Sequence, residues 1–219
     1  SIGWDMVFRA LRYRNFKVFF FGQGISLIGT WMQYVAMSWL VYKMTNSAFM
    51  LGVVGFASQI PTFILSPFTG VIADRHNRHK ILLFTQTLAM LQAFILAFLT
   101  LTGNIAVWHI IVMGIFLGCI NSLDIPARHS FILQMIEEKE NLGNAIALNS
   151  MMFNFARLIG PSIAGVLIAI AGEGVCFLIN AISYLAVIAS LFAMDKGVKI
   201  RKDKQESYDI FKDLKEGFN

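Results

Sequence analysis

The sequence predicts an all-α membrane protein built from six transmembrane helices. Hydrophobic residues make up 57% of the 219 residues and charged residues only 14%, whereas a soluble domain carries roughly 25% charged residues. A soluble protein of this size needs more polar surface to cover its core. Six apolar stretches are close to or above the roughly 20 residues that cross a bilayer: Phe16 to Tyr42, Phe49 to Ala73, Ile81 to Thr102, Ile105 to Leu123, Ala145 to Ala171 and Val175 to Met194.

The connections between these stretches alternate in length and charge. Those after the first, third and fifth stretches are short, so the helices that they join must form antiparallel hairpins. Of the 18 Lys and Arg residues, Lys43 alone falls in a short connection and Arg157 alone lies well inside a stretch. Basic residues favour the cytoplasmic side of a membrane. The sequence therefore predicts that both termini and the longer connections are cytoplasmic.

Residues 1–15 and 195–219 flank the six stretches and form the predicted cytoplasmic ends. The first end combines basic residues with apolar ones such as Trp4, a pattern typical of a segment that lies on the inner leaflet. The second end begins with a polar stretch, and apolar residues from Phe211 onward return at helical spacing. It is either a linker that ends in an interfacial helix or a disordered tail.

Several classes of function find no support in the sequence. The net charge is +5, but the basic residues stand in short clusters between apolar stretches, which argues against a nucleic-acid partner. Cys119 and Cys176 lie singly in apolar segments, without a second ligand at metal-binding spacing. The sequence contains no nucleotide-binding loop or nucleophile constellation. We therefore predict that the protein is no enzyme and holds no cofactor or metal, and that its partners are the lipid bilayer and a small-molecule substrate.

Polar residues form a stripe along the first stretch. Its members follow steps of three and four residues, which places them on one face of a helix: Gln23, Ser26, Thr30, Gln33 and Met37. This face is expected to point into the bundle or toward an aqueous cavity. Bonds between helices and a substrate pathway both explain it, and Gln23, Thr30 and Gln33 are our candidates for the pathway. Trp31 and Trp39 of the same stretch are expected to pack internally.

Two charged residues are unusual because an ionisable group at the centre of a span costs about 2.5 to 3.5 kcal/mol. Arg157 lies half way along the fifth stretch, on the same face as Asn154. It either lines a cavity or is paired, with a structural arginine that reaches the interface as the alternative. Asp124 lies at the cytoplasmic end of the fourth stretch, where Pro126 is expected to end the helix. Asn154 and Arg157 complete the predicted pathway.

Two segments resemble signatures of the major facilitator superfamily. The connection after the second stretch reads Gly70-Val-Ile-Ala-Asp74-Arg75-His76-Asn77-Arg78-His79-Lys80, similar to G-x-x-x-D-R-x-G-R-R/K. Asn77 replaces a glycine there, and asparagine accepts a left-handed turn at low cost. The fifth stretch contains Gly160-Pro161-Ser-Ile-Ala-Gly165, which resembles the G-P-x-x-G-G core of the antiporter signature. The segment from Leu11 to Met194 resembles the N-terminal half of a transporter from the branch that includes enterobactin and macrolide exporters.

This resemblance implies a fold and a location. Such transporters have twelve spans in two halves, each half consists of two inverted three-helix repeats, and substrate binds between the halves. The chain would supply one half in a bacterial inner membrane. The other half would be a missing C-terminal six-helix half or a second copy in a homodimer. In either case the polar stripe and Arg157 are expected to lie on an exposed face that the partner covers.

The resemblance also implies a cytoplasmic gate. Charges of the loop would hold the inner side closed, with Asp74 at the N-terminal end of another helix and Arg78 against Asp124. Arg75 is either part of this clamp or only a topological charge. The predicted gate residues are Gly70, Asp74, Arg75, Arg78, Asp124 and Arg128.

The favoured function is export of a small, fairly apolar organic molecule by alternating access, with proton coupling implied by the resemblance. A transporter of a lipid-like substrate would suit the same apolar bundle. A membrane scaffold that kept the fold without transporting is the alternative from another class, and it would need neither the polar stripe nor Arg157.

Overall fold

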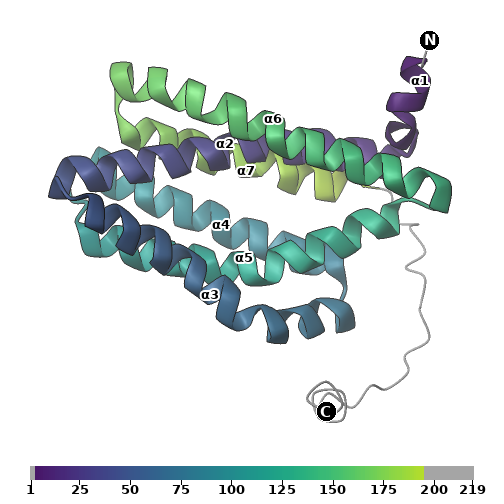
Figure 1. Ribbon diagram of the computed structural model, residues 1–219, viewed down its shortest axis with the longest axis horizontal. Coiled ribbons are helices and arrows are strands. Elements are labelled where there is room, and N and C mark those ends of the chain that lie inside the picture. The colour runs from purple at the N-terminus through teal and green to yellow at the C-terminus, as the bar shows by residue number, and fades with distance from the viewer. Residues whose placement is uncertain (1–2, 195–219) are drawn as a thin grey trace.

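A computed structural model describes residues 3–194, and in this part of the chain every regular element is helical (Figure 1). The elements are α1 (Trp4–Val7), the 3₁₀ helix η1 (Arg9–Arg12), α2 (Arg14–Thr45), α3 (Ala48–Arg75), α4 (Arg78–Leu101), α5 (Val107–Met135), α6 (Lys139–Ala171) and α7 (Glu173–Ala193). The predicted segment at 195–219 lies outside the described residues. All six apolar stretches are therefore helical.

Five of these helices, α3 to α7, are long and apolar enough to cross a membrane. The 32-residue α2 is long enough but less apolar, because the polar stripe runs along it. Among the five, α3 and α6 bury the smallest share of their residues inside the bundle. The uncovered surface of the bundle is therefore concentrated on these two helices.

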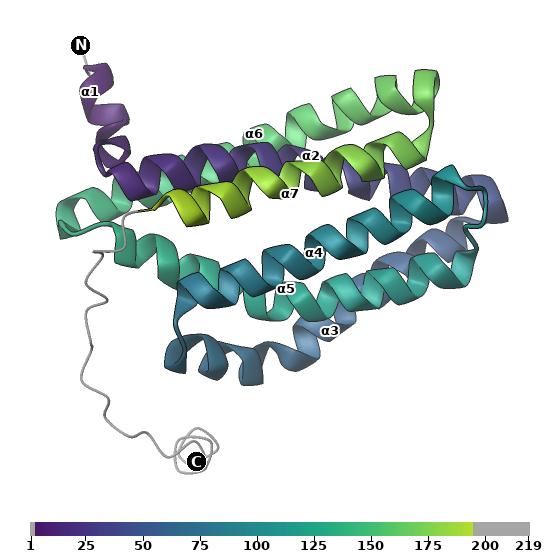
Figure 2. The same ribbon diagram turned by 180° about the vertical axis from the view of Figure 1, so that it is seen from behind.

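Most contacts between the helices occur in a small number of pairs. α2 lies along α7 and α6, α3 packs against α5, and α4 contacts both α7 and α5. In Figure 1, α2 lies between α6 and α3, while the view from behind in Figure 2 shows α7, α4 and α5. Glycines permit the closest approaches, since a Cβ at Gly29 would clash with Ser183 Oγ and one at Gly118 would clash with the carbonyl oxygen of Ser58.

Our prediction that Pro126 ends the fourth helix is wrong, because α5 continues through this residue to Met135. A proline inside a helix leaves the carbonyl of residue i−4 without its backbone donor. Here that carbonyl belongs to Ser122, and the Thr69 hydroxyl of α3 donates a hydrogen bond to it at 2.7 Å. In an apolar medium such a replacement bond lets the helix continue.

The short connections use specific turn residues. Asn46 ends α2 in the left-handed region with φ = 51°, and Ser47 caps α3 by accepting a hydrogen bond from the Met50 amide. Gly172, at φ = 87°, alone joins α6 to α7. The left-handed turn expected at Asn77 is not formed: its φ is −66°. Asn77 is instead the N-cap of α4, where asparagine is favoured for its side-chain acceptor.

The N-terminal segment is attached to the start of α6. The Asn144 side chain accepts a hydrogen bond from the Ala10 amide at 2.8 Å and donates one to the Val7 carbonyl at 2.7 Å. Asn141 donates to the Tyr13 hydroxyl at 3.1 Å. Trp4 remains 79% exposed at the end of this segment. The segment therefore has a fixed position at one end of the bundle.

Candidate functional site

The polar stripe of α2 faces the inside of this bundle. Gln23 and Gln33 are each 2% exposed. Gln33 donates to Gln92 of α4 at 3.1 Å and accepts from Asn180 of α7 at 2.6 Å. Gln92 in turn donates to the Met113 carbonyl of α5 at 3.3 Å. These bonds join four helices through amide groups.

The expectation that the stripe lies on an exposed face is therefore wrong for Gln23 and Gln33. Polar groups on α4 and α7 bind the Gln33 amide without a partner chain, whereas the buried Gln23 Oε1 accepts no hydrogen bond in the described bundle. Thr30 is half-buried, donates to the Ser26 carbonyl at 3.0 Å and lies 3.5 Å from the Tyr184 hydroxyl. Helix-to-helix bonding thus accounts for Gln33 and Thr30.

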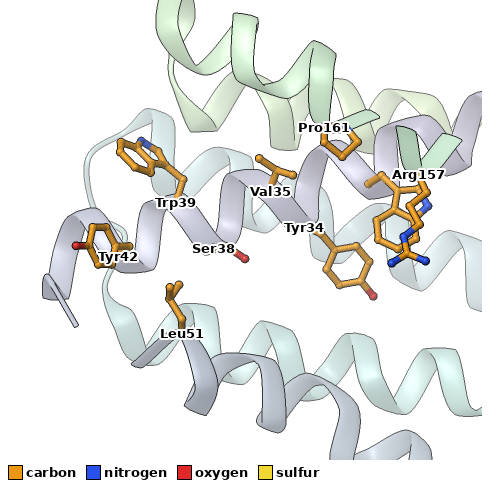
Figure 3. A pocket seen from close by; sticks show the side chains of 9 residues that line it. Tyr34, Val35, Ser38, Trp39, Tyr42, Leu51, Arg157 and Pro161 are labelled. Atoms are coloured by element: carbon orange, nitrogen blue, oxygen red, sulfur yellow. The ribbon is translucent and has the colours of Figure 1, made fainter. Parts of the chain in front are cut away.

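A pocket of about 650 Å³ lies next to the stripe, on the side of α2 that faces α3 and α6. Nine residues line it: Trp31, Tyr34, Val35, Ser38, Trp39, Tyr42, Leu51, Arg157 and Pro161. Six of these residues belong to α2. Figure 3 shows that Arg157 and Pro161 come from α6 and Leu51 from α3. Its volume lies in the range of sites for small organic molecules.

Arg157 is the charged member of this lining. Its guanidinium carbon lies 5.7 Å from the centroid of the Trp31 ring, a cation–π geometry. Within residues 3–194 no carboxylate forms an ion pair with it. Asn154, one turn earlier, is exposed and donates to the Ser150 carbonyl at 2.8 Å. Of the predicted pathway residues, only Arg157 lines the pocket.

The aromatic wall of the pocket was not among the features predicted from the sequence. Trp31 and Trp39 were expected to pack internally, yet both line the pocket together with Tyr34 and Tyr42. The signal was present, because the lining positions of α2 recur at steps of three and four residues. We had placed the substrate pathway on the polar stripe, which occupies the neighbouring face of the same helix.

The three residues of the helix-five signature have different surroundings. A Cβ at Gly160 would lie 2.6 Å from the Trp31 Cβ and 2.9 Å from the Ile28 carbonyl oxygen. Glycine is therefore required for the contact between α6 and α2. Pro161 lines the pocket, and a Cβ at Gly165 would meet nothing within 4 Å. Gly160 and Pro161 thus shape the pocket directly.

A buried charged cluster surrounds Asp124. Its side chain is 1% exposed and forms an ion pair with Arg128, one turn later in α5. The same carboxylate accepts hydrogen bonds from Thr85 at 2.6 Å and Gln86 at 2.7 Å, both in α4. Asp124 is therefore an interior residue of α5, which continues past Pro126 to Met135. The cluster binds α4 to α5 through a charged group.

The predicted pair between Arg78 and Asp124 is not formed. Arg78 lies 3.9 Å from Asp74, whose side chain is 73% exposed and therefore does not sit against another helix end. Gly70 is half-buried, and Arg75 is exposed at the end of α3. The loop contacts the bundle through His79, a residue that we had not selected: its Nε2 lies 2.6 Å from the Leu191 carbonyl of α7.

At the other end of the bundle, Lys43 and Glu173 form an ion pair of 3.1 Å. Lys43 is near the end of α2, and Glu173 begins α7. The Glu173 side chain is mostly buried. The pair therefore closes the two helices against each other beside the connection at Gly172.

Comparison with known proteins identifies relatives of this chain. Residues 6–219 match the family described as transmembrane secretion effector. The staphyloferrin A transporter of Staphylococcus aureus is 31% identical over 189 residues, which cover 85% of this chain and 47% of that protein. Macrolide efflux protein A of Streptococcus pyogenes is 21% identical over 212 residues, or 94% of this chain and 52% of that protein.

Enterobactin exporter EntS of Citrobacter koseri is 25% identical over 157 residues, or 72% of this chain and 38% of that protein. The chain spans about half or less of the length of these curated relatives. The family match extends over nearly the whole chain and agrees with a bundle of long apolar helices. The chain belongs to the transmembrane secretion effector family of major facilitator superfamily transporters.

Proposed function

We propose that this chain forms one half of a secondary active transporter that exports a small, fairly apolar organic molecule by alternating access with proton coupling. The observation that carries the proposal is the aromatic pocket over α2, which contains a single charged residue, Arg157. Apolar walls with few polar groups are typical of sites for small molecules. The relatives' names mention staphyloferrin A, a macrolide and enterobactin, which supports an organic molecule as the substrate.

The helix pairing supports a half-transporter made of two repeats. If α2, α3 and α4 are exchanged with α5, α6 and α7 in order, the pair α2–α6 becomes α5–α3, and α2–α7 becomes α5–α4. The pair α4–α7 is unchanged. Both members of each exchanged pair are observed contacts. This pattern is the one expected of two inverted repeats, in which α2 is the first of six spans.

The partner in this proposal covers the face that contains the pocket. α3 and α6 bury the smallest share of their residues, and both contribute to the lining. The relatives are about twice as long as their matched segments. A second six-helix half of the same protein is therefore the proposed partner, and a second copy in a homodimer is the other arrangement that would cover this face.

The proposed orientation in the bacterial inner membrane places both termini in the cytoplasm. In a cysteine-free background, single cysteines at Asn46 and Asn104 are expected to react with an impermeant maleimide added to intact cells. Cysteines at Asn77 and Lys139 should react only after the membrane is opened. All four positions are exposed, so lack of access cannot imitate a cytoplasmic position. The opposite labelling pattern would overturn the orientation.

Transport by the full-length protein in liposomes tests the function. We expect uptake of staphyloferrin A or a macrolide into these liposomes to require a pH gradient. Ser38→Trp, which fills the pocket, should lower the initial rate at least tenfold. Thr87→Trp is the matched control because Thr87 is exposed on α4, away from the pocket lining.

Equal rates for the Ser38→Trp variant and the Thr87→Trp control would contradict a role for the pocket. Uptake that is the same with and without the pH gradient would contradict proton coupling. Failure of every tested compound to move, with folded protein confirmed by gel filtration, would contradict the proposed class of substrate.

A further inference from the structure

Among the described residues, 3–194, no carboxylate forms an ion pair with Arg157. α2 contains no Asp or Glu, α3 contains only Asp74 at its end, and α6 contains only Glu140 in its first turn. These three helices form the pocket. A cation near the middle of a spanning helix is costly unless it is paired or faces a cavity. The pocket is thus an apolar site with an unneutralised positive charge at one end.

Trp31 holds this cation in a defined place. The indole ring lies under the guanidinium and is itself fixed by edge contact with Phe153, at 5.7 Å between ring centroids, and by Tyr34 at 5.6 Å. Stacking on a ring uses the face of the guanidinium and leaves the N–H groups at its edge available. Those N–H groups match the two oxygens of a carboxylate.

We infer that Arg157, positioned by Trp31, makes the pocket selective for organic anions, with a carboxylate at Arg157 and an apolar or aromatic body against the wall formed by Tyr34, Trp39 and Tyr42. The inference rests on the proposed function of the pocket as part of the substrate pathway. It adds that the exported molecule is charged at this end. A neutral compound of the same shape would leave the guanidinium without an acceptor in an apolar site, which is unfavourable.

A matched pair of probes tests the inference on the full-length protein in nanodiscs. Radiolabelled 1-naphthoate and its neutral amide, 1-naphthamide, have the same aromatic body and differ in charge. Equilibrium dialysis should show at least tenfold tighter binding of naphthoate to the unmodified protein. In Arg157→Gln this preference should disappear through loss of naphthoate affinity, with less than twofold change for the amide. Arg157→Lys should keep part of the preference, because the charge remains but the two-pronged geometry does not.

The control variant is Lys139→Gln, which removes the same charge from the same helix. Lys139 is the exposed first residue of α6, far from the pocket, so both probes should bind as they do to the unmodified protein. Equal affinity of the unmodified protein for the two probes, or binding of neither, would overturn the inference. An equal loss of both probes in Arg157→Gln would also overturn it, because that result means that Arg157 supports the pocket rather than selects charge.

A further pair of variants separates this inference from the proposed function. Tyr34→Ala and Trp39→Ala remove parts of the wall without changing charge, and both should weaken naphthoate and naphthamide together. If neither variant affects either probe, the pocket itself is not the binding site and the proposed function fails at this point. If both probes weaken in the wall variants but Arg157→Gln still prefers naphthoate to naphthamide, only the inference fails.

Discussion

Replacing Asp124 with leucine is expected to cause the largest loss of stability of any single change in the bundle. The variant leaves Arg128 without its ion-pair partner and leaves the Gln86 amide without its acceptor. Removing one partner of a buried ion pair typically costs about 3 to 5 kcal/mol. We expect a fall in the melting temperature of the purified protein of about 10 °C, measured by intrinsic fluorescence in detergent, together with loss of transport.

Two further variants test the cause of this effect. Asp124→Leu combined with Arg128→Leu removes both charges and should recover at least half of the lost melting temperature. Asp74→Leu removes a carboxylate that is 73% exposed and 3.9 Å from Arg78, and an ion pair of an exposed carboxylate is worth only about 0 to 1 kcal/mol. It should melt nearly as the unmodified protein does. A single Asp124→Leu variant that melts like Asp74→Leu would show that the cluster does not bind α4 to α5.

Valine at Gly160 is expected to separate α6 from α2 and to disturb the pocket. The new side chain would meet the Trp31 Cβ and the Ile28 carbonyl, and neither is the flexible end of a side chain. Overpacking of this kind costs about 1 to 3 kcal/mol, or a fall in melting temperature of about 5 °C. Since Trp31 also supports Arg157, transport should fall at least tenfold.

Gly165→Val supplies the matched control in the same helix. A Cβ there meets nothing within 4 Å in the described bundle, so the melting temperature should change by less than about 1 °C apart from the helix propensity of the residue. Comparable destabilisation by the two substitutions would contradict the assigned contact between α6 and α2. A variant at Gly165 that folds but no longer transports would instead place Gly165 against the proposed second half.

Much of the fold could be predicted from the sequence because long apolar segments in lipid have few alternatives to helices. The six apolar stretches, their order and the short hairpin connections depend on local composition and on turn residues such as Asn46. The membrane class follows from the ratio of apolar to charged residues. The family resemblance rests on two short motifs, which can be recognised in the sequence without knowing where the helices end. These properties depend on residues that are close together in the sequence, so they can be predicted from the sequence alone.

Tertiary structure alone decided which face of a helix packs in the core and which face lines the pocket. Gln33 and Tyr34 are neighbours in sequence, yet one joins α4 and α7 in the core and the other lines the pocket. Periodicity shows that a stripe exists, but the partner of a stripe depends on the helices placed beside it. The continuation of α5 past Pro126 depends likewise on Thr69, which is distant in sequence and satisfies the freed carbonyl. Asp124 pairs with Arg128 instead of Arg78, because a buried carboxylate binds the donors that the packing of α4 against α5 brings to it.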